Sequence, residues 1–222
     1  MLELVLIYQK NGQFGYKNYG GFDNRNETMI NLVYHSILQR EKNTVVSDFE
    51  FWIYTGDDNG VQNKHSTLQK ILNSDKNCFS FSNTPNDRVL TIPDWAFWNW
   101  PQVGIHDYTE VTSKIMIEGN KPPEINKVGW IGNCLTNPIR NKLFQIGSQF
   151  PDLLDIMDTG KWKRIPNKIQ CQTKKHPYLS MDGLVKKYSI LIDVEGNGYS
   201  GRGKFLLYSN RPYIFQKRPL TE

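Results

Sequence analysis

The sequence predicts an α/β protein built from two halves, each with a parallel sheet. Short apolar runs typical of buried strands alternate with helical patterns in both halves. A polar segment with two adjacent prolines, at 117–127, separates the halves and has the composition of a linker. The 222 residues are enough for two small domains. We therefore expect domains at 1–118 and 119–222.

In the first half, the clearest helix is expected at 27–41. Its apolar residues recur at helical spacing, and Asn26 before it is a suitable N-cap. A second, shorter helix is expected at 66–74 and strands at 3–8, 48–54 and 78–82. The glycine- and asparagine-rich stretch after the first strand predicts turns.

In the second half, Pro138 behind Asn137 has the pattern of a helix start, which predicts a helix at 138–150. Another helix is expected to begin within "SGRGKFLLYS". The apolar runs predict strands at 128–132, 153–157, 188–194 and 212–217.

The charge balance is moderately basic, with a net charge of +5 and a pI near 9.0. Solvated basic faces would explain it, and so would an anionic ligand such as a nucleotide sugar. No basic stripe repeats at helical spacing, which argues against nucleic acid.

The cysteines and the amino terminus bear on the compartment. Three widely spaced cysteines without a C-x-x-C motif argue against a disulfide framework and favour a reducing, cytoplasmic environment. The apolar run at 2–8 is too short for a signal-peptide core or a membrane span.

Two aspartates, Asp57 and Asp58, follow the strand expected at 48–54. Open α/β sheets bind ligands at the carboxyl ends of their strands, so a carboxylate here is a candidate general base or half of a metal site. An aspartate-rich turn without a ligand would have the same sequence. No histidine shows metal-ligand spacing.

Four aromatic residues lie within "DWAFWNW": Trp95, Phe97, Trp98 and Trp100. They form either a core plug or a platform on which a sugar or peptide acceptor lies.

The stretch "WIGNCLTNPIR" has the order strand, small-residue loop, helix start. A helix amino terminus can receive a phosphate, and Arg140 would add a cationic contact. Many such turns bind nothing.

The stretch "DVEGNGYSGRGKF" satisfies G-x-G-x-x-G through Gly196, Gly198 and Gly201. A dinucleotide site also needs an acidic residue about 20 positions further on, and only the last residue, Glu222, lies near that distance. A nicotinamide-linked enzyme therefore rests on this pattern alone. Arg202 and Lys204 beside the glycines favour a diphosphate site over a ligand-free turn.

Taken in order, these blocks resemble glycosyltransferase family 90, the Rumi-like protein O-glucosyl- and xylosyltransferases and the related capsule-type xylosyltransferases. The resemblance runs from about residue 45 to 218. Its blocks are "SDFEFWIYTGDD", "FSFSNT" with "IPDWAFW", "WIGN" with Arg140, and "KYSILIDVEGNGYSGRGKFLLYSNRPYIF".

The resemblance implies a GT-B architecture, in which two Rossmann-like halves face a cleft, with the acceptor side first and the nucleotide-sugar side second. It also implies inverting transfer of a glucose- or xylose-type sugar from a UDP-sugar to a glycan or protein hydroxyl, without an essential metal or other cofactor. Asp57 matches the general base and Arg202 the arginine that holds the diphosphate.

The remaining site residues are expected in two groups. Donor contacts are expected from Gly132, Asn133, Thr136, Arg140, Gly196, Ser200, Gly201 and Lys204. Acceptor contacts are expected from Asp58, Asn83, Trp95, Phe97 and Trp98.

The chain also departs from the family pattern. Ile131 stands where the family often has arginine, and "QKRPLTE" ends the match before the segments that usually complete the donor site. We therefore expect a second half that is truncated, as in a minimal viral or microbial version. The alternative is a non-catalytic module of this fold that binds carbohydrate or a partner protein.

Overall fold

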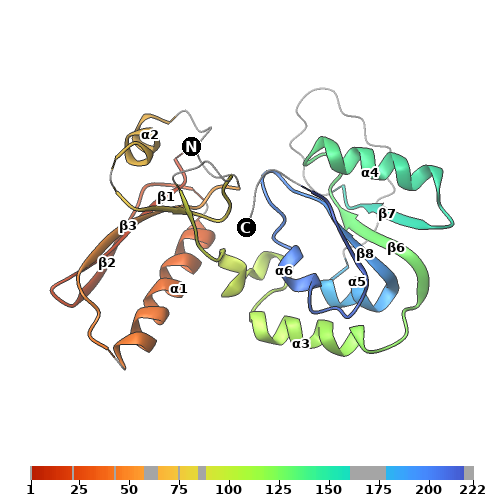
Figure 1. Ribbon diagram of the computed structural model, residues 1–222, viewed down its shortest axis with the longest axis horizontal. Coiled ribbons are helices and arrows are strands. Elements are labelled where there is room, and N and C mark those ends of the chain that lie inside the picture. The colour runs from red at the N-terminus through yellow and green to blue at the C-terminus, as the bar shows by residue number, and fades with distance from the viewer. Residues whose placement is uncertain are drawn as a thin grey trace. The chain divides into compact units, whose positions relative to one another are not determined.

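The computed structural model in Figure 1 describes residues 2–21, 23–42, 44–57, 65–74, 76–84, 89–160 and 179–217. The chain divides into two compact units, Met1–Trp100 and Pro101–Arg218. Each unit contains one sheet, so the protein is a mixed α/β protein, as the sequence predicts. None of the described helices is long and apolar enough to cross a membrane.

The division after Trp100 lies earlier than the boundary expected at residue 118. Helix α3 (Tyr108–Gly119) packs against α5 (Met181–Lys187) and α6 (Gly203–Leu206), and the ring centroids of Tyr108 and Phe205 lie 4.9 Å apart. The segment expected to be a linker therefore contains the end of α3 and the start of strand β6 (Ile125–Gly132).

The sheet of the first unit is mixed, not parallel as expected. Its strands are β1 (Leu4–Lys10), β2 (Gln13–Asn18), β3 (Phe49–Tyr54), β4 (Cys78–Ser80) and β5 (Leu90–Thr91), in the order β2-β1-β3-β4-β5. Strand β1 runs antiparallel to β2 and β3, whereas β3, β4 and β5 are parallel.

The unexpected strand β2 is explained by the turn before it. Asn11 and Gly12 have φ angles of 52° and 74°. Two successive positive φ angles form the tight hairpin turn for which Asn-Gly is the preferred sequence. The Asn-Gly pair thus folds the chain back onto β1, and the turn-rich stretch after it becomes a strand.

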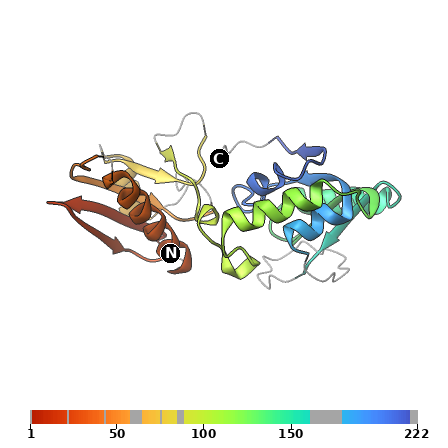
Figure 2. The same cartoon turned by 90° about the horizontal axis from the view of Figure 1, so that it is seen from below.

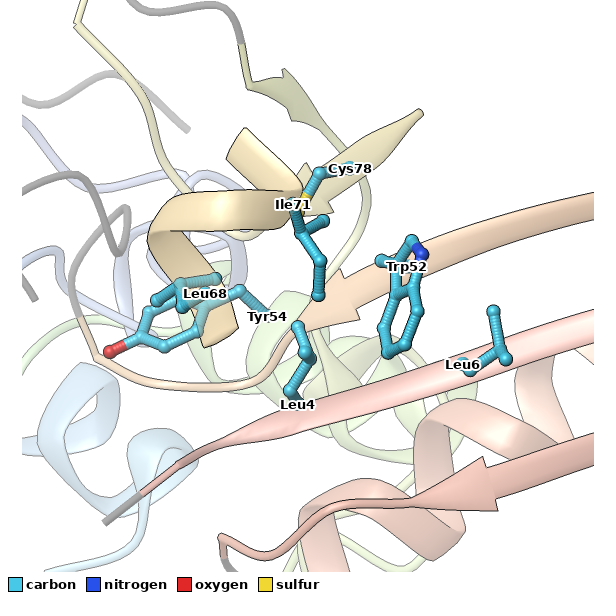
Figure 3. Close-up of a cluster of buried hydrophobic side chains, with 7 residues drawn as sticks. All are labelled: Leu4, Leu6, Trp52, Tyr54, Leu68, Ile71 and Cys78. Carbon is cyan, nitrogen blue, oxygen red and sulfur yellow. The ribbon is translucent and has the colours of Figure 1, made fainter. Parts of the chain in front are cut away.

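One helix lies on each face of the first sheet (Figure 1). Helix α2 (Ser66–Leu72) inserts Leu68 and Ile71 among the side chains of Leu4, Trp52 and neighbouring residues. Figure 3 shows this cluster. Because successive strand residues alternate between faces, Val5, Ile7 and Ile53 point to the opposite face, where α1 (Asp23–Glu41) contacts β1 and β2.

Asn26 does not cap α1, contrary to the sequence prediction. The helix begins at Asp23, so Asn26 lies within its first turn and is fully buried. Its amide Nδ2 donates to Asn18 Oδ1 at 2.9 Å and to the carbonyl of Gly20 at 3.0 Å. Its Oδ1 accepts from the Thr55 hydroxyl at 2.7 Å. This one side chain therefore connects α1 to the ends of two strands.

The sheet of the second unit is parallel, as expected, with the order β7-β6-β8-β9. The other strands are β7 (Leu154–Asp158), β8 (Tyr188–Asp193) and β9 (Tyr213–Phe215). Helix α4 (Pro138–Gln149) covers one face, and Asn137 caps it as predicted, with Oδ1 accepting from the Ile139 amide at 2.9 Å.

Helices α3 and α5 cover the other face of this sheet, and the sequence did not predict either of them. Figure 2 shows α3, in green, running across that face. The strands below are close-packed: a Cβ on Gly129 would lie 2.0 Å from the ring of the fully buried Tyr188. The two faces are thus both covered, as is usual for a parallel sheet.

Candidate functional sites at the strand ends

In the first unit, Asp57 forms an ion pair with an arginine of the first turn of α1. Its Oδ1 lies 2.7 Å from Nη1 of Arg25, and one third of the Asp57 side chain is exposed to solvent. Arg25 also donates to the carbonyl of Thr55, at 3.4 Å. Because β3 ends at Tyr54, the chain turns here so that Asp57 meets the start of α1 at the carboxyl end of the strand.

The guanidinium of Arg25 is held from its other side by Trp95. Its Cζ lies 4.1 Å from the Trp95 ring centroid, a cation–π distance. Trp95 is only 3 % exposed, and its ring packs edge-on against Phe81 and Trp100. Asp94 caps this short 3₁₀ turn (Trp95–Phe97) by accepting from the Ala96 amide at 2.9 Å. The Trp95 ring therefore packs against the guanidinium of Arg25, and little of this ring is exposed to an acceptor.

The other aromatic residues of this segment are more accessible. Phe97 is 38 % exposed, and Trp98 stacks on the exposed His35 with centroids 4.8 Å apart. Asn83 donates to the carbonyl of Val89 at 3.1 Å. Asp58 lies outside the described residues.

In the second unit, the residues predicted to bind the sugar donor lie at the carboxyl ends of β6 and β8, in the loops that follow and in the first turns of α4 and α6. Asn137 donates to the carbonyl of Gly196 at 2.8 Å, and Arg140 Nε donates to that of Glu195 at 2.7 Å. The start of α4 is thereby tied to the glycine loop after β8. Residues that the sequence places more than 50 positions apart are thus brought together.

Both predicted arginines lie near the buried ring of Trp130. The Cζ atoms of Arg140 and Arg202 are 5.5 and 6.0 Å from its centroid. A Cβ on Gly132 would lie 2.7 Å from the same ring, so a larger residue there would displace it. Both guanidinium groups thus lie near Trp130, and their positive charge at this end of the sheet would attract an anion.

Buried polar groups shape the loop between β6 and α4. Asn133 Oδ1 accepts from the Leu135 amide at 2.9 Å, and the Thr136 amide donates to the Asn133 carbonyl at 3.3 Å. Asp158 Oδ1, at the end of β7, accepts from the Cys134 amide at 3.0 Å. Asp158 Oδ2 is buried and has no hydrogen-bond partner among the described residues. The loop conformation therefore depends on side chains and not on packing alone.

The glycine loop has its own internal contacts. The Gly196 amide donates to the Tyr199 carbonyl at 3.0 Å, which closes a turn, and Lys204 Nζ lies 6.0 Å from the Tyr199 ring centroid. Gly201 and Arg202 are partly exposed. Gly201, Arg202 and Lys204 thus follow a closed turn in the order that the sequence predicts.

Sequence reasoning missed several residues that build these sites. In the first unit they are Arg25, Asn26 and Thr55, and in the second unit Trp130, Asp158 and Asp193. Asp158 and Asp193 each end a strand, and this position was a usable signal, because a carboxylate there can bond to groups of the following loop. Nothing in the local sequence marks Arg25 as the partner of Asp57.

Two hollows on the first unit lie away from these residues. One, of about 410 Å³, is lined by Gln9, Gly12, Gln13, Phe14, Tyr34, Ile37 and Leu38. The other, of about 390 Å³, is lined by Gln9, Lys10, Asn11, Asp48, Phe49 and Glu50. None of the catalytic, donor-binding or acceptor-binding residues predicted from the sequence lines either hollow.

The protein is thus a mixed α/β protein with an acidic strand end in one unit and, in the other, a glycine loop with Arg140 and Arg202 close to the buried Trp130. The sequence matches glycosyl transferase family 90 over residues 10–222, and the chain belongs to this family. The resemblance stated from four sequence blocks is thereby confirmed. Comparison with curated protein sequences gives no match. Membership assigns the chain to the transferases that move a glycosyl group from a donor to an acceptor.

Proposed function

We propose that the protein is an inverting glycosyltransferase that moves a glucose- or xylose-type sugar from a UDP-sugar to an acceptor hydroxyl. The observation that carries the proposal is that Arg202 and Arg140 both lie within about 6 Å of the Trp130 ring centroid, beside the glycine loop, in a chain of this family. The proposed arrangement of the two units is GT-B, with the acceptor on the first and the donor on the second.

On the donor side, the loop residues bind the diphosphate. Arg202 and Arg140 supply cationic hydrogen-bond donors, and the backbone amides around Gly196, Ser200 and Gly201 supply neutral ones. Charge grows on the diphosphate as the bond to the sugar breaks, so donors fixed in advance stabilise the transition state more than the ground state. In this proposal no metal is essential, because the arginines offset that charge.

On the acceptor side, Asp57 acts as general base. Its carboxylate takes the proton from the acceptor hydroxyl while that oxygen attacks the anomeric carbon, on the side opposite the departing UDP. Arg25 holds Oδ1 at 2.7 Å and so fixes the orientation of the carboxylate. Phe97 and Trp98 offer the accessible rings for the acceptor.

A panel of nucleoside diphosphates and nucleotide sugars, screened by thermal shift and then by product analysis, tests the proposal. We expect UDP and one UDP-sugar to raise the melting temperature, because a ligand that binds only the folded state stabilises it. The product should have the anomeric configuration opposite to that of the donor. Stabilisation by free sugars or glycans with none by UDP would instead support the non-catalytic binding module.

A further inference from the structure

Asp193, the last residue of β8, has a buried carboxylate that the proposed reaction leaves unassigned. It is 1 % exposed, and Oδ1 accepts from the Ser200 hydroxyl at 2.5 Å. A buried carboxylate is costly unless hydrogen bonds compensate it, and O–H···O⁻ bonds of this length are among the stronger ones. The contact therefore constrains the loop between the two residues.

The Asp193–Ser200 bond closes the loop that carries the glycines. The chain leaves β8 at Asp193, passes through the turn closed by Gly196 and Tyr199, and returns to Asp193 at Ser200. The hydroxyl has a single proton, which goes to Asp193. Toward an anion, Ser200 therefore contributes its backbone amide, in keeping with its expected role.

The residues after Ser200 are fixed to the same point. The Arg202 amide donates to Ser200 Oγ at 3.4 Å, and the Gly203 amide donates to the Ser200 carbonyl at 3.3 Å. A Cβ on Gly203 would lie 3.4 Å from Asp193 Oδ2 and 3.2 Å from Tyr213 Oη, so the start of α6 lies directly against the carboxylate. The backbone amides of Arg202 and Gly203 are thus bonded to Ser200, whose hydroxyl is in turn held by Asp193.

We propose that Asp193 is a positioning residue for the donor anion. Through Ser200 it fixes the backbone at Arg202, so that the guanidinium stays beside Trp130 and Arg140. With 1 % of its surface exposed, Asp193 has no direct access to a ligand and acts through the loop alone. This role rests on the proposed function, because it assumes that Arg202 contacts the diphosphate of the donor.

The test is titration of UDP into the parent protein and a set of variants. Ser200→Ala removes the hydrogen bond, and Asp193→Asn leaves only a neutral amide oxygen to accept it. We expect each change to weaken UDP binding about tenfold, the usual contribution of a hydrogen bond to a charged group. The double variant should bind UDP little more weakly than either single one, because both changes act on the same charge-assisted bond. Ser200→Thr, which retains the hydroxyl, should restore most of the affinity. In steady-state kinetics, KM for the UDP-sugar should rise while KM for the acceptor stays unchanged.

Asp155→Asn is the matched control, on a strand that β6 separates from β8. Asp155 lies in β7, where its Oδ2 accepts from the Tyr188 hydroxyl at 2.7 Å, away from the glycine loop. We expect this variant to lower the melting temperature without changing UDP affinity. Equal losses of UDP affinity in Asp155→Asn and Asp193→Asn would overturn the positioning role, because general destabilisation would then explain both.

Two further measurements separate failure of this inference from failure of the proposed function. If the parent binds UDP and Arg202→Ala weakens binding but Asp193→Asn does not, the inference is wrong and the function stands. Hydrogen exchange without ligand gives an independent reading: amides at 200–206 should exchange faster in Asp193→Asn and Ser200→Ala than in the parent. Unchanged exchange there would overturn the inference whether or not UDP binds.

Discussion

The two strand-end sites differ in what holds them together. In the first unit, two charged side chains meet directly, Asp57 from the loop after β3 and Arg25 from α1, and a buried tryptophan supports the arginine. In the second unit, the candidate ligand groups belong to loops that are held by hydrogen bonds: Asn137 and Asp158 bond to loop backbone groups, and Asp193 accepts from the Ser200 hydroxyl. A single carboxylate suits proton transfer, whereas a fixed backbone with nearby cations suits an anion. The difference supports giving the base to the first unit and the donor to the second.

The largest expected effect is the loss of turnover when the proposed general base of the first unit, Asp57, is replaced. Asp57→Asn keeps the size of the side chain and removes the base, so we expect kcat to fall 10²- to 10⁴-fold, the range that general base catalysis contributes. Release of UDP from the UDP-sugar in the presence of acceptor measures it. Asp48→Asn is the control, because Asp48 is a carboxylate of the same unit that accepts from the Asn11 amide at 2.9 Å and has no proposed role in the reaction. Full turnover by Asp57→Asn would show that Asp57 is not the general base.

The next effect concerns the sheet that positions the glycine loop. Gly129→Ala would bring a Cβ to 2.0 Å from the Tyr188 ring, in a layer already covered by α5. Overpacking of this kind costs about 3 kcal/mol, which chemical denaturation of the variant would show. Gly183→Ala, within the short helix α5, should cost much less, since the added Cβ would lie 3.1 Å from the hydroxyl of the N-cap residue Ser180, which needs to shift by only a few tenths of an ångström. Equal stability of the two variants would contradict the close packing of β6 on β8.

A smaller effect is expected from the polar centre of the first unit. Asn26→Ala removes three hydrogen bonds and leaves the fully buried Thr55 hydroxyl without this acceptor, whereas the exposed Gly20 can turn to water. Unsatisfied buried groups of this kind cost about 2 kcal/mol in the free energy of unfolding. Thermal or urea unfolding measures the loss. Asn141→Ala, on the partly exposed face of α4, is the control and should lie within about 0.5 kcal/mol of the parent.

The smallest effect concerns the rate at which the buried Cys78 thiol is alkylated. Burial under α2 raises the pKa of the Cys78 thiol to about 12, so the thiol stays protonated at pH 8. Because the thiolate is the reactive form, we expect alkylation of Cys78, followed by mass spectrometry, to be far slower in the folded than in the denatured protein. The folded state also binds this proton more tightly than the unfolded state. Its contribution to stability is therefore full below pH 8 and is lost as the pH rises toward 12.

The sequence predicted those features that depend on local chemistry. Asn137 and Pro138 specify the start of α4, and the apolar runs specify the buried strands of the second unit. The order of Gly196, Gly201 and Arg202 was sufficient to indicate a turn followed by a cation, and the structure has that turn. These features need few long-range contacts.

The features that were missed depend on packing between distant residues. Helix α3 has a local start signal, because Asp107 caps it and Glu110 follows three residues on, but its buried face is set by contact with α5 and α6. Asn26 reads as a cap until Asn18, Gly20 and Thr55 are in place around it. Similarly, the partner of Asp57 is 32 positions away in the sequence and becomes visible only when α1 lies on the sheet. Whether the domains divide the acceptor and donor as proposed stays a prediction.

The most direct test of the account is calorimetric titration of UDP into the parent, Asp57→Asn and Arg202→Ala proteins. In the proposed function, UDP binds to the second unit alone. We therefore expect Asp57→Asn to bind UDP as the parent does, while Arg202→Ala binds at least about tenfold more weakly. Weakened binding in Asp57→Asn together with unchanged binding in Arg202→Ala would contradict the division of labour between the two units.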